Sequence, residues 1–360
     1  MSVRAFLPAA FVIVVAMIDG PTRGESPPAG SDLKFTAPAT SGNLTIYLIE
    51  GPDRIKGKTF LTLEEALAQK KAIVHETKQV NELSIENVST DAEIFVQAGD
   101  IVKGGQQDRV LAFDLIVPKQ SGKVPIAAFC VEAGRWTGRP GEASGSFASS
   151  KGSLISNDLK IAAREHVSQQ EVWSNVAKAQ AALSVKLQTE VKSNRSASSL
   201  QLTLENKPLN DAIAGAVKEL SALPDKHADA IGCAIAINGK VIGADTYASA
   251  ALFRKLWPKL LKAAVIEAVA EQKKDLKFEA PDVDAVKAFL TDAEHGKAKE
   301  RAASKRVSEV RKEGEKALLF ESCDKDNGGA VLRQSYLTKT APQPVERPRQ
   351  PNAPNPRNDR

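Results

Sequence analysis

The chain has 360 residues, of which 42% are hydrophobic and 26% are charged. This composition is ordinary for a globular protein, and the length is sufficient for a single large domain with a sizeable core. The net charge of +5 is spread thinly, with no basic stripe interleaved with aromatic residues, which argues against a nucleic-acid surface.

The N-terminus has the features of a secretory signal. One arginine precedes an apolar run from Ala5 to Ile18, and a polar segment follows the run. The run is shorter than a membrane-spanning helix requires but fits the hydrophobic region of a signal peptide. We therefore expect a signal peptide over residues 1–24, export to the periplasm or the medium, and no stable membrane span.

Segments of biased composition flank the rest of the chain. Residues 25–42 are rich in Pro, Gly, Ser and Thr and predict a linker. Residues 339–360 are rich in Pro and Arg and predict a disordered tail. Residues 43–338 mix strand-like and helical patterns, which predicts a single large α+β domain with mostly antiparallel strands and packed helices.

Strand patterns fill most of the first half of this domain. Thr62 and Glu65 form a capping box at the start of a short helix. The small residues from 139 to 156 predict a long loop, and a lid over the neighbouring candidate site is one hypothesis for it. The small polar residues from 189 to 202 predict another loop. Strands are expected at 43–50, 72–77, 81–89, 93–102, 109–117 and 124–132.

Helical patterns become frequent in the second half. Ser168 and Ser249 have the sequence context of N-caps. Further helices are expected after Pro208 and Pro281, since proline is favoured in the first turn of a helix. Pro258 should kink or divide the helix that Ser249 begins.

Two hairpins and one charged helix complete the expected elements. Asn238-Gly239 predicts a type I′ turn within a hairpin over 231–247. A final hairpin is expected over 317–337. The mixed charges of residues 297–316 predict a solvated helix between the two hairpins.

The segment from 101 to 138 places polar residues at the ends of apolar strands. Residues 109–117 predict an inner strand, and a loop of hairpin length joins it to the strand at 124–132. If the two strands pair antiparallel, the polar segments GGQQDR (104–109) and EAGRWTGR (132–139) meet at the same end of the sheet. This convergence defines the candidate site.

Arginines, glycines and an aromatic residue give this site the character of an anion-binding site. Glycine lets the backbone turn or approach a ligand closely, and the guanidinium fork matches phosphate. With Arg139 also near, the set suits a small anionic, planar or sugar-phosphate ligand. The candidate binding residues are Gly104, Gly105, Gln106, Arg109, Arg135 and Trp136.

If the protein is an enzyme, catalysis would depend on Cys130, Glu132 and Asp108. Glu132 or Asp108 would act as general acid or base, and Cys130 as a nucleophile if the arginines lower its pKa. The chain has no phosphate-binding glycine motif, no zinc-protease or serine-hydrolase motif and only four scattered histidines, so no metal and no cofactor are expected.

Two non-catalytic alternatives use the same residues. In one, the site is a binding module that performs no reaction. In the other, the protein is a structural or protein-interaction module of the cell envelope. Arg109 and Arg135 would then pair with Asp108 and Glu132, and Trp136 would pack in the core.

Several of these blocks together resemble a known family. The blocks are GGQQDRVL, VPIAAFCVEAGRW, SQQEVW (168–173), and LPDKHADAIGCAIAINGKVIGADTY followed by FRKLWPKLLKAA. In this order they resemble the bacterial ARG- and rhodanese-phosphatase-superfamily-associated protein domain, or ARPP, over most of residues 43–337. ARG denotes ADP-ribosylglycohydrolase, so the resemblance implies a neighbourhood in NAD and ADP-ribose metabolism, without implying a particular activity.

Overall fold

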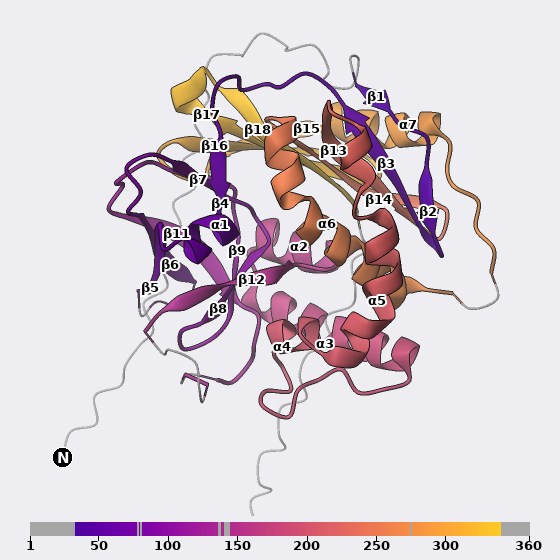
Figure 1. Cartoon of the computed structure of the whole chain (residues 1–360), viewed down its shortest axis with the longest axis horizontal. Helices are drawn as coiled ribbons and strands as arrows, with labels where there is room; N and C mark the ends of the chain where they lie inside the picture. Colours follow the sequence, from indigo (N-terminus) through magenta and orange to yellow (C-terminus); the bar gives the residue numbers. More distant parts are fainter. Residues whose placement is uncertain are drawn as a thin grey trace, which may run out of the picture.

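The structure is a computed structural model that describes residues 33–77, 79, 81–135, 138–139, 145–273 and 276–339. The expected signal peptide and nearly all of the expected tail lie outside these residues. The described part contains seven α-helices and three sheets, and every strand pair except β4–β7 is antiparallel. The predicted fold class, one large α+β domain with mostly antiparallel sheets, is confirmed (Figure 1).

Strands predominate in the first part of the domain, and most of the helices follow β12. The strands are β1 (Lys34–Phe35), β2 (Ala39–Ser41), β3 (Leu44–Glu50), β4 (Phe60–Thr62), β5 (Ala72–Glu76), β6 (Glu82–Asn87), β7 (Glu93–Val96), β8 (Asp100–Gly104), β9 (Arg109–Leu111), β10 (Leu115–Val117), β11 (Lys123–Cys130), β12 (Phe147–Ser153), β13 (Ala230–Ile237), β14 (Lys240–Tyr247), β15 (Lys297–Ala302), β16 (Val307–Glu313), β17 (Ala317–Asp324) and β18 (Ala330–Thr338). The helices are α1 (Leu63–Ala68), α2 (Asn157–Arg164), α3 (Gln169–Leu187), α4 (Leu200–Leu204), α5 (Lys207–Leu220), α6 (Ala250–Glu271) and α7 (Val283–Glu294).

The largest sheet has helices packed against both of its faces. Its strand order is β1-β3-β13-β14-β18-β17-β16-β15, and β2 also pairs with β3. Strand β3 is apolar at nearly every position because both faces are covered: Ile46 and Leu48 pack in the cluster that contains α6, whereas Tyr47 and Ile49 pack in the cluster that contains α7. Figure 1 shows α6 in the middle of the domain.

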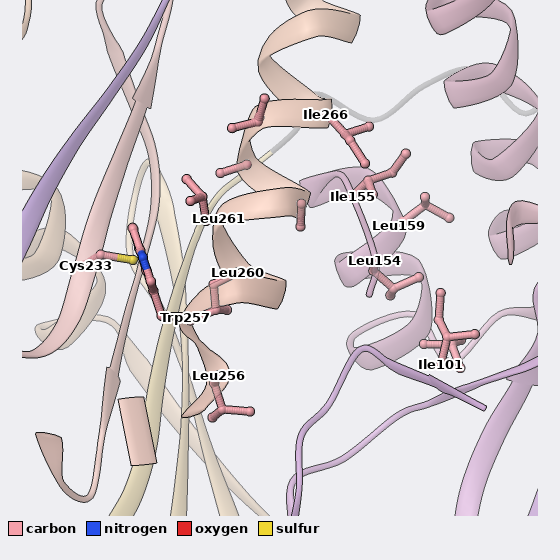
Figure 2. Close-up of a cluster of buried hydrophobic side chains, with 14 of the residues drawn as sticks. Ile101, Leu154, Ile155, Leu159, Cys233, Leu256, Trp257, Leu260, Leu261 and Ile266 are labelled. Atoms are coloured by element: carbon pink, nitrogen blue, oxygen red, sulfur yellow. The ribbon is translucent and has the colours of Figure 1, made fainter. Parts of the chain in front are cut away.

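Helix α6 begins and continues as its sequence requires. The Ser249 hydroxyl caps it by accepting the N–H of Leu252 (3.2 Å). The helix continues through Pro258, so it is not divided there. Figure 2 shows Cys233 of β13 pointing toward Trp257 of α6, while the side chains of the segment before α2 lie on the other side of the helix. The helix is therefore buried along most of its length.

The hairpin of β13 and β14 confirms the turn prediction. Asn238 and Gly239 have φ values of 52° and 73°, the left-handed conformation that a type I′ turn needs at both central positions. The final hairpin, β17 and β18, also forms where it was expected.

One predicted strand and one predicted helix were wrong because charged side chains decide the local structure. Residues 109–117 form two short strands in different sheets instead of one, since Asp114 between them turns its buried carboxylate to the N–H of Ala98 (2.7 Å) and to Arg333 (3.0 Å). Residues 297–316 form β15 and β16 instead of a helix. Their mixed charges pair across the strands, as Arg301 does with Glu309 (2.8 Å).

Three segments interpreted as loops or linker contain regular structure. Strands β1 and β2 lie within the expected linker and pair with β3. Helix α4 lies at the end of a segment, 189–202, whose small polar residues indicate a loop. Strand β12 lies within the expected lid and pairs with β8, so the lid hypothesis is wrong for residues 147–153; residues 140–144 lie outside the described residues.

Candidate functional site

The two polar segments meet at one end of the six-stranded sheet β12-β8-β9-β11-β6-β5. Strand β11 pairs antiparallel with β9, and Cys130 lies opposite Arg109. The N–H of Val131 then bonds to the carbonyl of Asp108 (3.0 Å), which extends the pairing beyond the strand ends. The predicted convergence is therefore confirmed for residues 104–109 and for the described part of the second segment, residues 132–135 and 138–139.

The turn between β8 and β9 requires glycine. Gly104 and Gly105 have φ values of 117° and 56°. A Cβ atom on Gly105 would lie 2.4 Å from the ring of Phe147 and 2.6 Å from Oε1 of Glu76. The same Glu76 oxygen accepts the N–H of Gln106 (2.9 Å), so the turn is closed tightly against a carboxylate of β5.

Asp108 is completely buried, and both of its carboxylate oxygens accept hydrogen bonds. Its Oδ1 accepts from Arg139 (2.6 Å) and from the N–H of Gly104 (3.0 Å). Its Oδ2 accepts from the hydroxyl of Ser199 (3.2 Å), the residue that also caps α4. Burial raises the pKa of Asp108, and the Arg139 charge and the Gly104 N–H oppose that increase.

Glu132 is buried beside Arg135 and Arg139. Its Oε2 accepts from Nε of Arg135 (2.8 Å) and lies 3.6 Å from Nη1 of Arg139. The amide of Gln107 donates to the Glu132 backbone carbonyl (3.0 Å). However, Oε1 of Glu132 and Oε1 of Gln107 are both buried and accept no hydrogen bond from the residues that the structure describes. A buried acceptor left unsatisfied costs about 1–3 kcal/mol.

The Cys130 thiol lies beside charged side chains, but its pKa is not lowered. Arg109 donates to its Sγ, and Glu76 lies 3.6 Å from the same guanidinium. Burial raises the pKa of Cys130 to about 11, with the charge of Arg109 acting in the opposite direction. The condition for a nucleophilic thiol, a pKa lowered by the arginines, is therefore not met. The Cys130 backbone is held at both its N–H and its carbonyl by the side chain of Gln169 (2.8 Å each).

The charges of the site balance one another. The side chains of the three arginines are nearly buried, with exposed fractions of 1% for Arg109, 2% for Arg139 and 11% for Arg135. Three carboxylates face them, from Glu76, Asp108 and Glu132. Trp136, the aromatic candidate, lies outside the described residues. Among the described residues, no group of three His, Cys, Asp or Glu side chains is placed to hold a metal ion.

Sequence reasoning missed four residues of this cluster. Gln107 lies within the GGQQDR segment, and Gln169 is the second residue of the SQQEVW block, so their place in the blocks that resemble the family was an available signal for both. Glu76 ends a strand and Ser199 lies in a polar segment, and neither carries a local signal that links it to the site. These residues reach the cluster only through tertiary packing.

The fold and the site together define an α+β protein with a buried, charge-balanced cluster at the end of a small antiparallel sheet. Residues 32–337 match the family described as ARG and Rhodanese-Phosphatase-superfamily-associated Protein domain, ARPP-1. The chain belongs to this family, as the resemblance of its blocks implied. No curated protein and no solved structure matches the chain. No helix in the described part of the chain has the length and apolarity needed to cross a bilayer.

Proposed function

We propose that this protein binds an anionic nucleotide or ADP-ribose-like ligand at the cluster formed by GGQQDR and CVEAGRW. The observation that carries the proposal is the pair of buried acceptors, Glu132 Oε1 and Gln107 Oε1, that receive no hydrogen bond from the described residues. Buried polar atoms in folded proteins are nearly always satisfied. Acceptors of this kind beside arginines suit a ligand that carries both hydroxyl donors and phosphate, as a sugar nucleotide does.

Ligand binding would exchange partners within the cluster. Arg135 has the most exposed side chain of the three arginines and holds Glu132 at 2.8 Å. A phosphate would draw the Arg135 guanidinium away from Oε2 of Glu132, and ribose hydroxyls would donate to Glu132 in its place and to the unsatisfied Oε1 of Gln107. The exchange keeps each charge partnered, which matters because an unpaired charge in a buried site costs several kcal/mol, about 3–5 in measured cases.

The same geometry supports binding in preference to catalysis. The thiol of Cys130, with a pKa of about 11, is protonated at neutral pH and is a poor nucleophile. Asp108 accepts three hydrogen bonds within the protein, so its carboxylate has little capacity left for proton transfer to a ligand.

Thermal unfolding of the full chain tests the proposal, with ADP-ribose, NAD, nucleotides, sugar phosphates and simple anions as probes. Ligand at about a hundred times its dissociation constant should stabilise the protein by roughly 2.7 kcal/mol, enough to raise the midpoint by several degrees. Arg135→Ala should remove the shift. Arg254→Ala, which alters a half-buried arginine of α6 that donates to the backbone carbonyls of His227 and Ala228, should retain the shift. No shift with any probe would contradict the proposal.

A second function is favoured by the charge balance. The pairs Arg139–Asp108 (2.6 Å) and Arg135–Glu132 (2.8 Å) already place a carboxylate beside each guanidinium group that would face a ligand. A cluster of this kind also suits a structural or protein-interaction module of the cell envelope. That function predicts that Arg135→Ala lowers the unfolding temperature without altering the response to any probe.

We also propose export through the N-terminal signal peptide, since the apolar run from Ala5 to Ile18 has the length of a signal sequence. Fractionation of cells that express a C-terminally tagged chain should find a shortened protein outside the cytoplasm. Deletion of the run should keep the protein inside. A full-length wild-type chain that stays in the cytoplasm would contradict export.

A further inference from the structure

A small cavity lies between α2, α6 and the largest sheet, apart from the cluster described above. Its volume is about 40 Å³. The α6 residues that line it, Leu260, Ala263, Ala264 and Glu267, follow the spacing of one helix face. Small and branched apolar residues form most of the wall, and Figure 2 shows Leu154 and Leu260 on the two sides of this region. The charged exceptions in this wall are Lys160, Arg164, Asp245, Glu267 and Arg333.

Glu267 is a buried acid with few partners. It is 9% exposed, and its Oε1 accepts the N–H of Asn157 at the start of α2 (3.1 Å). It makes no other hydrogen bond and no ion pair with the described residues. Burial raises its pKa to about 7, so near neutral pH a large part of the population carries a proton on this side chain.

Lys160 is the cation that faces this acid. Its charge lowers the pKa of both Glu267 and Cys233, so the ammonium acts on groups of α6 and β13 across the cavity. Within the described residues the ammonium makes no hydrogen bond and no ion pair. A half-buried lysine beside an acid that is often neutral therefore lacks a counter-ion.

The other charges around the cavity are already paired or belong to its rim. Arg333 bonds to Asp245 (2.9 Å) and to Asp114 (3.0 Å), and Arg164 bonds to Asp114 (2.9 Å). These pairs are buried, and they leave Lys160 as the cation available to a ligand. The charged groups that face Glu267 from neighbouring elements are Asp158, Lys160 and Arg164 on α2, Glu271 on α6, Asp245 on β14 and Arg333 on β18.

We propose that this cavity is a binding site for a short-chain monocarboxylate, whose carboxylate meets Lys160 and accepts a hydrogen bond from the protonated Glu267. The single uncompensated cation selects a monoanion over a phosphate dianion. The apolar wall receives the alkyl end. A cavity needs roughly 10–15 Å³ of volume for each water-sized group, so about three to four such groups fit, which corresponds to formate or acetate.

Calorimetric titration of the full 360-residue chain with formate, acetate, propionate and hexanoate at about pH 6 tests the site. Formate and acetate should bind, and propionate and hexanoate should bind more weakly because their chains exceed the cavity. Lys160→Met should weaken acetate binding by about tenfold or more, since a charge-assisted hydrogen bond is lost. Lys218→Met, which changes an exposed lysine of α5, is the matched control and should leave the affinity unchanged.

The pH dependence separates this site from general anion binding. Affinity of the wild type should fall as the pH rises from about 6 to 8, because ionised Glu267 repels the carboxylate. Glu267→Gln should keep the affinity and lose this pH dependence, and it remains informative if Lys160→Met fails to fold. The proposal is overturned if no carboxylate binds, if Lys160→Met binds acetate as tightly as the wild type, or if Glu267→Gln keeps the wild-type pH profile. Such results would leave the cavity as a hydrated space.

Discussion

Replacement of Glu267 by glutamine should stabilise the protein above neutral pH and change it little in mild acid. Burial raises the pKa of this carboxyl from an ordinary value near 4.5 to about 7. The folded state therefore holds the proton more tightly than the unfolded state does. The contribution of the protonated group is complete below about pH 4.5 and is lost progressively as the pH rises to about 7.

The size of the effect follows from the two pKa values. Each tenfold change in acidity is worth about 1.4 kcal/mol, so ionisation of Glu267 in the folded state lowers the free energy of unfolding by about 3 kcal/mol above pH 7. Glutamine has nearly the same shape and can still accept the Asn157 N–H, but it has no charge to bury. The variant should gain most of this amount at about pH 8, which corresponds to roughly 5 °C in the unfolding midpoint.

Urea unfolding of both proteins between about pH 5 and 8, in a buffer without carboxylates, measures the difference directly. Glu300→Gln, which changes an exposed acid on β15, is the control and should differ from the wild type by less than about 0.5 kcal/mol throughout. A stability difference between Glu267→Gln and the wild type that does not grow with pH would refute the assignment of a raised pKa to Glu267.

Three other substitutions or reactions test separate parts of the structure. Gly105→Ala should lower the free energy of unfolding by about 3 kcal/mol, because the position has a positive φ and the new methyl group would lie 2.4 Å from an aromatic ring. Gly57→Ala, with a positive φ and open space, should lower it by about 1 kcal/mol, and denaturant unfolding of both variants gives the comparison. Cys130 should react with a thiol reagent at neutral pH only after unfolding, and rapid labelling that disappears in Cys130→Ser would show an accessible thiolate instead. Asp114→Ala should lower the free energy of unfolding by about 3–5 kcal/mol, because two buried guanidinium groups lose a partner. Asp211→Ala, which removes an exposed ion pair, should lower it by less than about 1 kcal/mol. Equal losses would contradict the buried network.

Elements specified by a few adjacent residues were predicted well from the sequence. The Thr62 capping box forms with both of its hydrogen bonds, and Ser168 and Ser249 cap their helices. Asn238-Gly239 closes its hairpin. The meeting of GGQQDR and CVEAGRW was also predictable, because antiparallel pairing of neighbouring strands follows from loop length and alternation.

Features that depend on distant partners were not predicted. Asp114 interrupts an apolar run because its partners lie on α2 and β18, far along the chain. The charges of residues 297–316 fit either a solvated helix or paired strands, and the neighbouring β17 decides for strands. Strand β12 consists mainly of small polar residues and is ordered by pairing with β8. In each case tertiary context outweighs the local pattern.

The candidate site shows the same division. Sequence patterns identified the arginines and carboxylates near the strand ends, and Arg135 pairs with Glu132 as expected for a salt-bridged strand end, but the other pairs differ from that expectation. Arg109 faces Glu76 and Cys130, and Asp108 is held by Arg139. Lys160 and Glu267 were not recognised from the sequence, because each lies in an ordinary helical pattern. They line a common cavity only when α2 and α6 pack together.

The most direct test of the proposed ligand site is a calorimetric titration of the full chain with ADP-ribose and with an analogue that lacks the ribose hydroxyls. The buried acceptors Glu132 Oε1 and Gln107 Oε1 require donors from the ligand, so removal of the hydroxyls should weaken binding by about tenfold or more. Equal affinity for the two compounds, or no binding of ADP-ribose, would contradict the assignment of these acceptors to a sugar-nucleotide ligand.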